Sequence, residues 1–86
     1  MKTRFANVNS PKALAAALSQ RRADLDMTQA EVAYAAGVSR QWLVAVEQGK
    51  STAEIGRVLR VVRVLGLDVG LTIRPPSTSI EAILNG

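Results

Sequence analysis

The chain has 86 residues, 48% of them hydrophobic, and its 11 Lys and Arg against 7 Asp and Glu give a formal net charge of +4. It contains neither Cys nor His, which excludes disulfides, thiol nucleophiles, imidazole bases and most zinc or haem sites. Because the carboxylates are scattered along the chain, we expect neither an enzyme nor a cofactor. What remains is one small domain whose moderately basic charge is compatible with a polyanionic partner.

The N-terminal stretch MKTRFANVNSPKALAAAL has basic residues before an Ala/Leu run, as a signal peptide does. Its uninterrupted apolar run covers only Ala13 to Leu18, whereas a secretory signal needs ~7–15 apolar residues. No run in the chain approaches the ~20 residues of a membrane span. We therefore expect no membrane association and a cytoplasmic protein, with residues 1–9 as an N-terminal arm in which Lys2 and Arg4 are solvated.

The first helix is predicted to begin at Ser10-Pro11, an N-cap followed by proline at the first helical position. Leu14 and Leu18 then fall on one stripe of the helix. Arg22 lies on that same stripe, eight residues after Leu14. A cation on an apolar face indicates either a side chain that reaches out to solvent or a buried partner.

Two short helices are predicted next, joined by a tight turn. Thr28, with Glu31 three residues later, forms a capping box, and Gly37 can end that helix in the left-handed conformation. Ser39 is the next N-cap and Gly49 the next stop. This spacing is typical of a helix–turn–helix.

The stretch KSTAEIGRVLRVVRVLG predicts a fourth helix, with a capping box from Ser51 and Glu54 and an end at Gly66. Its arginines are interpreted as solvated or as ion-paired, including with acids of a partner; they are Arg57, Arg60 and Arg63. Its inward stripe is expected to consist of Ile55, Val58, Leu59, Val62 and Leu65. Val61 and Val64 lie outside this stripe, which indicates a second buried side against another subunit.

After this helix, apolar and polar residues alternate over residues 67–74, the spacing of a half-buried strand. One strand alone cannot satisfy its backbone groups, so we expect it to pair with the same strand of a second copy. The domain boundaries are then 10–66 for the helical domain, 67–74 for the dimerisation strand and 75–86 for a tail. The expected dimer interface consists of Val61, Val64, Leu67, Val69, Leu71 and Ile73.

The third helix, residues 39–48, carries two faces on a wheel of ~100° per residue. Leu43 and Val46 face inward, with Glu47 close by. The opposite face suits the major groove of DNA, because Arg can bond guanine, Gln can bond adenine and small apolar side chains can touch a thymine methyl. The expected base contacts are Arg40, Gln41, Val44 and Ala45. The expected phosphate contacts are Thr28, Gln29, Ser39, Trp42, Gln48 and Lys50.

Trp42 has two interpretations, because it lies on the flank of the outward face. It either contacts the sugar–phosphate backbone or packs over the second helix around Tyr34. Arg and Gln on a solvated helix face are in themselves ordinary, and it is the capped helix–turn–helix that favours DNA binding.

The stretch TQAEVAYAAGVSRQWLVAVEQGK resembles the helix–turn–helix of the XRE (Cro/C1-type) repressor family, and the resemblance covers Leu14 to about Leu65. It implies an all-α, four-to-five-helix lambda-repressor-like domain followed by one C-terminal β-strand. It also implies that the third helix enters the major groove of operator DNA, that Gln29 contacts a phosphate, and that Glu47 pairs with an Arg of the first helix. The inward wheel position of Arg22 makes it that partner.

The stretches NSPKALAAAL and LDVGLTIR resemble the two ends of HipB-type antitoxins within that family. This resemblance implies a homodimer whose strands form an intermolecular sheet, repression of its own operon, a place on the bacterial nucleoid and a HipA-like kinase toxin as partner. Two alternatives stay open. One is a stand-alone phage-type repressor, and the other is a protein-interaction module that uses the helix–turn–helix as a scaffold.

Overall fold

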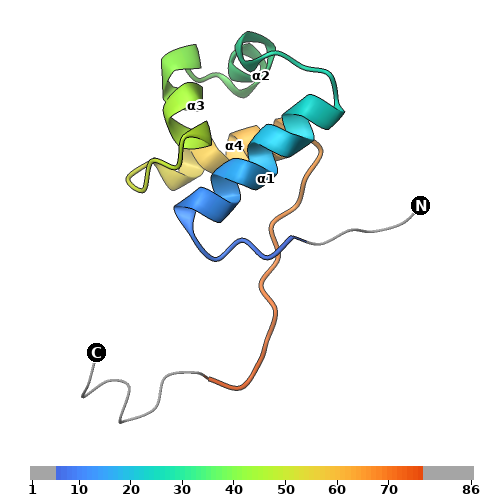
Figure 1. Cartoon of the computed structure of the whole chain (residues 1–86), viewed down its shortest axis with the longest axis vertical. Coiled ribbons are helices and arrows are strands. Elements are labelled where there is room, and N and C mark those ends of the chain that lie inside the picture. The colour runs from blue at the N-terminus through green and yellow to red at the C-terminus, as the bar shows by residue number, and fades with distance from the viewer. Residues whose placement is uncertain (1–5, 77–86) are drawn as a thin grey trace.

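The structure, a computed structural model, describes residues 6–76. Within this range the chain forms four helices, α1 (Pro11–Asp24), α2 (Gln29–Ala36), α3 (Arg40–Glu47) and α4 (Ile55–Val64), and no strand. In Figure 1, α1 runs across the front of α4, while α2 and α3 lie above them. The all-α prediction is confirmed for the described residues.

The N-caps predicted for α1 and α2 both form the expected hydrogen bonds. The Ser10 hydroxyl oxygen accepts a hydrogen bond from the Ala13 backbone N–H at 3.0 Å, with Pro11 at the first helical position. The Thr28 hydroxyl accepts from the Glu31 N–H at 3.1 Å, and the Glu31 carboxylate accepts from the Thr28 N–H at 2.8 Å. This reciprocal box satisfies two backbone donors that the first turn of a helix would otherwise leave open.

The turn between α2 and α3 also follows the predicted pattern. Gly37 ends α2 in the left-handed conformation with φ 69°, which a side chain would strain. The Ser39 hydroxyl then accepts from the Trp42 N–H at 3.0 Å and caps α3. After α3, Gly49 has φ 92° and turns the chain away from the helix. The ends of the two helices of the helix–turn–helix are therefore set by local capping residues and left-handed glycines.

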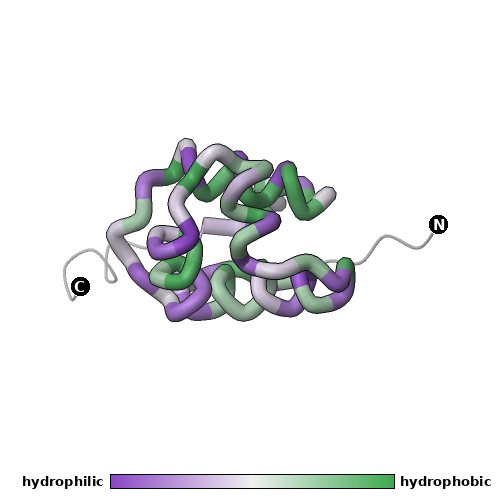
Figure 2. Tube along the Cα trace, turned by 90° about the horizontal axis from the view of Figure 1, so that it is seen from above, coloured by the Kyte–Doolittle hydropathy of each residue, from purple (hydrophilic) through white to green (hydrophobic). Residues whose placement is uncertain are grey.

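The core lies where the four helices meet, and its buried side chains are all aliphatic. No polar or charged residue in the described range is buried. Figure 2 shows hydrophobic and hydrophilic residues alternating along the helices, as such a packing requires. The largest fully buried side chains are Leu18, Val32, Leu43, Val61 and Leu65.

The start of α4 differs from the prediction. The helix begins at Ile55, and its N-cap is Glu54, which makes no side-chain capping hydrogen bond. The Glu54 carboxylate instead forms an exposed ion pair with Arg57 at 3.3 Å. The capping box predicted for Ser51 and Glu54 is therefore wrong, because residues 51–53 stay outside the helix.

The buried side of α4 is also rotated relative to the predicted stripe. Val61 is fully buried at 0% exposure, whereas Ile55 is 67% exposed and Leu59 is 41% exposed. The side chain of Val61 packs in the core of its own chain, so its expected place in a dimer interface is wrong. Val64 and Leu67 are half-buried and pack against the same core.

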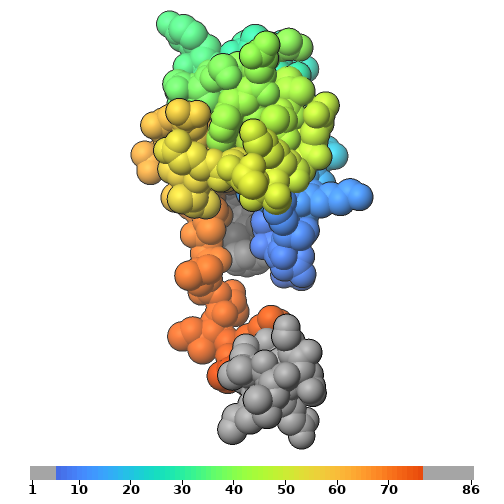
Figure 3. Space-filling view, turned by 90° about the vertical axis from the view of Figure 1, so that its left-hand side faces the viewer, coloured from blue at the N-terminus to red at the C-terminus, as the bar shows by residue number. Residues whose placement is uncertain are grey.

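Residues 67–76 have no regular structure in this single chain. Figures 1 and 3 both show the segment after α4, coloured orange, leading away from the helical body. Its alternate apolar side chains are exposed, Val69 at 61%, Leu71 at 97% and Ile73 at 98%. The strand expected over 67–74 thus stays a prediction that a second copy would have to fulfil. Lys2 and Arg4 of the arm and residues 77–86 of the tail lie outside the described residues.

Candidate nucleic-acid interface

The third helix is fixed to the core along one side only. Leu43 is 0% and Val46 4% exposed, and both belong to the main hydrophobic cluster. Arg40 and Gln41, in the first turn, are exposed to solvent. This division follows the two faces expected from the sequence, so α3 is held by its inner side and presents the polar side chains of its N-terminal end.

A bidentate ion pair ties the C-terminal end of α3 to α1. Arg22 donates from Nε to Glu47 Oε2 at 2.9 Å and from Nη2 to Glu47 Oε1 at 2.8 Å. It also donates from Nη1 to the Met27 carbonyl oxygen at 3.1 Å. The two side chains are 19% and 6% exposed, respectively. The pairing inferred for Arg22 and Glu47 is confirmed, and its two parallel bonds fix orientation as well as distance.

The environment of Glu47 keeps its carboxylate ionised. Burial acts to raise the pKa of Glu47, but the hydrogen bonds and charge of Arg22, with the bond from Gln29, outweigh it and leave the pKa below its usual value. The hydrogen bond to Glu47 likewise raises the pKa of Arg22. Both groups are therefore charged at neutral pH, and each neutralises the other.

Gln29 connects this ion pair to the first residue of α2. Its Nε2 donates to Glu47 Oε1 at 3.3 Å, and the side chain is half-buried. One N–H of the amide group and its carbonyl oxygen are left for other partners. Helices α1, α2 and α3 thus meet at the Glu47 carboxylate, which receives hydrogen bonds from Arg22 and Gln29.

The remaining predicted contact residues divide by exposure. Val44 and Ala45 are half-buried, so they present less apolar surface than the wheel indicates. The other side chains expected at phosphates are exposed, namely Thr28, Ser39, Gln48 and Lys50.

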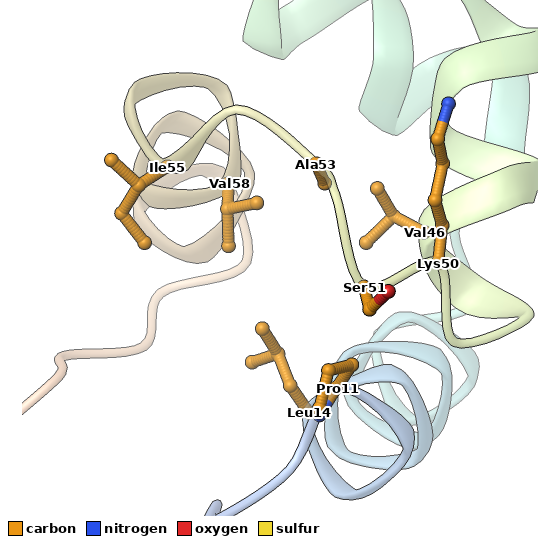
Figure 4. A pocket seen from close by; sticks show the side chains of 8 residues that line it. All are labelled: Pro11, Leu14, Val46, Lys50, Ser51, Ala53, Ile55 and Val58. Carbon is orange, nitrogen blue, oxygen red and sulfur yellow. The ribbon is translucent and has the colours of Figure 1, made fainter.

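Lys50 lies beside an apolar hollow that also includes residues of α1 and α4. Figure 4 shows its ammonium group pointing along α3, away from Leu14 and Pro11. The hollow is lined by Pro11, Leu14, Val46, Lys50, Ser51, Ala53, Ile55 and Val58. The cation is therefore directed to the side of the molecule on which α3 lies, while most of the residues that line the hollow are aliphatic.

Trp42 packs against the hydrophobic cluster and is half-buried. Tyr34, around which it was alternatively expected to fold, is 91% exposed and so makes no such packing. The indole contributes to the core, and a contact with the DNA backbone stays a prediction for its exposed part.

Two arginine contacts were missed by the sequence analysis. Arg21 Nε donates to the Leu65 carbonyl oxygen at 2.9 Å, at the C-terminal end of α4. Arg60 Nε donates to the Ala36 carbonyl oxygen at 3.1 Å, at the end of α2. Cations favour helix C-termini, where carbonyl groups lack partners. Because each arginine is far in sequence from the carbonyl group that it contacts, no local sequence pattern predicts the contact.

Two features are absent from residues 6–76, a metal-binding cluster and a membrane-spanning helix. No group of three or more His, Cys, Asp or Glu side chains in that range is placed to hold a metal ion. None of the four helices there is long and apolar enough to cross a membrane.

The architecture defines the class of protein, a helix–turn–helix domain, and comparison with known sequences agrees. Residues 13–74 match the family model described as "Helix-turn-helix domain". Over 64 residues the chain is 34% identical to the uncharacterized HTH-type transcriptional regulator y4mF of Sinorhizobium fredii, covering 74% of this chain and 84% of that protein. The chain belongs to the helix–turn–helix family of transcriptional regulators.

Solved structures place the fold more narrowly. A complex of a HipB variant with an O2 20mer aligns at a TM-score of 0.77 and 24% identity, covering 84% of this chain and all 100% of that chain. A HipA–HipB–O2–O3 complex aligns at a TM-score of 0.76 and 22% identity, covering 83% and 100%, respectively. The fold is therefore similar to that of HipB, which confirms the family resemblance found in the sequence.

Proposed function

We propose that this protein is a dimeric, sequence-specific DNA-binding repressor. One observation carries the proposal: α3 is fixed in orientation by the Arg22–Glu47 pair, while Arg40 and Gln41 in its first turn remain exposed. A helix that must place side chains against base edges has to be held rigidly, because hydrogen bonds to bases depend on direction as well as distance.

The first turn of α3 supplies the side chains for base recognition. Arg40 can donate two hydrogen bonds to guanine O6 and N7, and Gln41 can bond adenine N6 and N7. Each such bidentate pair discriminates against a wrong base by ~1–3 kcal/mol. Val44 and Ala45 are half-buried and add methyl contacts of smaller area. Specificity therefore rests mainly on the two polar residues.

Phosphate contacts would set the register of α3 in the groove. Gln29 is positioned for this role because Glu47 fixes its amide group, which still has one N–H to donate. Ser39 and Lys50 lie at the two ends of α3, and backbone N–H groups at a helix N-terminus attract phosphate. Thr28, Gln48 and the exposed part of Trp42 complete the proposed set.

The exposed segment after α4 supports a homodimer. Val69, Leu71 and Ile73 present an alternating apolar row to solvent, and pairing with the same row of a second copy would bury it and complete the backbone hydrogen bonds. A two-fold axis through this pairing would set two α3 helices against half-sites ~34 Å apart.

The partner protein is proposed from the HipB likeness. One of the similar solved structures is a HipA–HipB–O2–O3 complex, and we infer a HipA-like kinase toxin for this chain, whose operon the pair would repress. A stand-alone phage-type repressor shares the same DNA chemistry and differs only in the neighbouring gene. The scaffold alternative rests on apolar surface at Val44 and Ala45 and on the tail SIEAILNG. The half-burial of Val44 and Ala45 weakens the first of these grounds, and the tail lies outside the described residues.

Fluorescence anisotropy with the duplex upstream of the protein's own gene tests this function. Binding should be tighter than to a shuffled duplex and should weaken by at least about a thousandfold between 50 and 200 mM salt, because a protein with ~6–10 phosphate contacts releases that many counterions. Affinity that does not change with salt, or equal affinity for both duplexes, would contradict sequence-specific repression.

A further inference from the structure

A second hollow lies on the surface between α2 and α4, and both apolar and cationic side chains line it. Ala35 and Ala36, at the end of α2, and Val64 of α4 are its apolar lining, called its floor below, and the other lining residues are Arg60 and Arg63 of α4. This hollow includes none of the residues assigned above to bases or phosphates, and the proposed function leaves it without a role.

Arg60 is fixed in this hollow. Its Nε donates to the Ala36 carbonyl oxygen at 3.1 Å, which holds the guanidinium against the end of α2. The two terminal nitrogens remain as donors, since an Arg side chain carries five N–H groups. Arg63, one turn further along α4, is exposed.

The two arginines have no acidic neighbour in the part of the chain that is described. The ion pairs between residues 6 and 76 are Arg22–Glu47 and Arg57–Glu54. Helix α4 itself contains three arginines and no acid. A hollow with a small apolar floor and two cations without an acidic partner among residues 6–76 is complementary to a carboxylate attached to an apolar stem.

We propose that this hollow binds an acidic segment of a partner protein, which places an Asp or Glu carboxylate between Arg60 and Arg63 and an apolar side chain over Val64. Arg–carboxylate contacts are strong because the planar guanidinium matches two oxygens. Arg is also enriched at protein–protein interfaces, as a flat cation that tolerates desolvation. The surface is independent of the DNA-binding face and goes beyond the proposed repressor function.

A protein segment fits this hollow better than the DNA backbone does. Gln29, a proposed phosphate contact, is at the opposite end of α2, ~10 Å away at 1.5 Å per residue. An apolar floor adds nothing to a phosphate contact but buries part of a protein side chain.

Titration of the ¹⁵N-labelled full chain with an acetylated, amidated Asp-Leu-Glu-Leu peptide tests the proposal by NMR. The amide resonances of Ala35, Ala36 and Val64 should shift and saturate. The neutral Asn-Leu-Gln-Leu peptide should leave them in place. Arg63→Gln should weaken the acidic peptide about tenfold, as the loss of one charge-assisted contact does. Arg57→Gln is the matched control, with the same charge change on the same helix but outside the hollow, and should bind as the unaltered chain does.

Several outcomes would overturn the proposal. They are equal weakening by Arg63→Gln and Arg57→Gln, equal binding of the neutral peptide, and an absence of shifts in the hollow. Arg63 is exposed and outside the core, so its variant should keep the helical circular dichroism spectrum of the unaltered chain. Arg63→Gln should also leave affinity for the upstream duplex unchanged. If Arg63→Gln weakened binding to the duplex as much as binding to the peptide, the hollow would be a DNA contact. Failure of the repressor proposal is a different result, in which the unaltered chain itself does not prefer the upstream duplex.

Discussion

Replacement of Glu47 by Gln isolates the charge that holds α3 in place. The amide has nearly the shape of the carboxylate, but it leaves the Arg22 guanidinium without its counter-ion. Arg22 is only 19% exposed, so solvent replaces little of what is lost, and its remaining partner is the Met27 carbonyl oxygen. The perturbation is therefore an uncompensated cation in a largely buried position.

The expected cost follows from this geometry. Breaking a buried ion pair on one side costs ~3–5 kcal/mol, and the partial exposure of Arg22 together with the acceptor that Gln retains lowers the expectation to ~2–3 kcal/mol. Domains have stabilities of ~0.05–0.15 kcal/mol per residue, which is ~4–13 kcal/mol for a chain of this length. The substitution should remove a large fraction of that stability.

Urea unfolding followed by circular dichroism, at one fixed protein concentration, measures the cost. Glu54→Gln is the matched control, because Glu54 and Arg57 form an exposed pair with side chains 65% and 47% exposed. That pair should contribute ~0–0.5 kcal/mol. Equal losses for Glu47→Gln and Glu54→Gln would refute the view that burial gives the first pair its structural importance.

Four further outcomes are expected from the structure. The stability advantage of the unaltered chain over Glu47→Gln should be full at pH 7 and shrink as the pH falls below ~4.3. The reason is that the pKa of Glu47 is lower in the folded than in the unfolded chain, so its carboxylate stops stabilising the fold once it is protonated. Urea midpoints that differ equally at pH 7 and pH 3 would contradict this. Thr28→Ala should lower the free energy of unfolding by ~1 kcal/mol through loss of the cap on the Glu31 N–H. Val61→Ala should lower the free energy of unfolding by ~2 kcal/mol, since the side chain is fully buried. A change near zero in urea unfolding would contradict the burial of Val61 in the core. Ile73→Asp should convert the proposed dimer to a monomer in analytical ultracentrifugation, with the helical circular dichroism signal unchanged. A variant that remains dimeric would show that the segment after α4 plays no part in association.

Local signals explain why three of the four helices could be predicted from the sequence. Ser10, Thr28 and Ser39 each precede a helix and have a backbone N–H three residues on that needs an acceptor. Gly37 occupies a left-handed position that few other residues adopt without strain. These choices are made within four or five residues of chain, so the sequence contains all the information they require.

The start and the buried side of α4 could not be fixed in the same way. Ser51 and Glu54 have the spacing of a capping box, but the helix begins only at Ile55. Apolar residues occupy most of the circumference of α4, so their periodicity allows more than one register. Packing against the other helices selects the one that buries Val61 and exposes Leu59.

The candidate site was predictable where it depends on residue type and spacing. Arg22 and Glu47 are 25 residues apart. The family resemblance predicted that Glu47 pairs with an Arg of the first helix, and the inward wheel position of Arg22 identified it as that Arg. The contacts of Arg21 and Arg60 with backbone carbonyls were not predictable, because a carbonyl group carries no side-chain signature. The half-burial of Val44 and Ala45 likewise depends on how closely α3 packs on its neighbours.

The most direct test of base recognition by α3 is the specificity ratio of its first turn. The dissociation constants for the upstream duplex and for a shuffled duplex should be measured for the unaltered chain, Arg40→Ala and Gln41→Ala at one salt concentration. Each substitution should reduce the ratio by about 5- to 150-fold, the equivalent of ~1–3 kcal/mol per bidentate contact, with circular dichroism unchanged. A ratio unaffected by both substitutions would show that α3 does not read the sequence of the DNA.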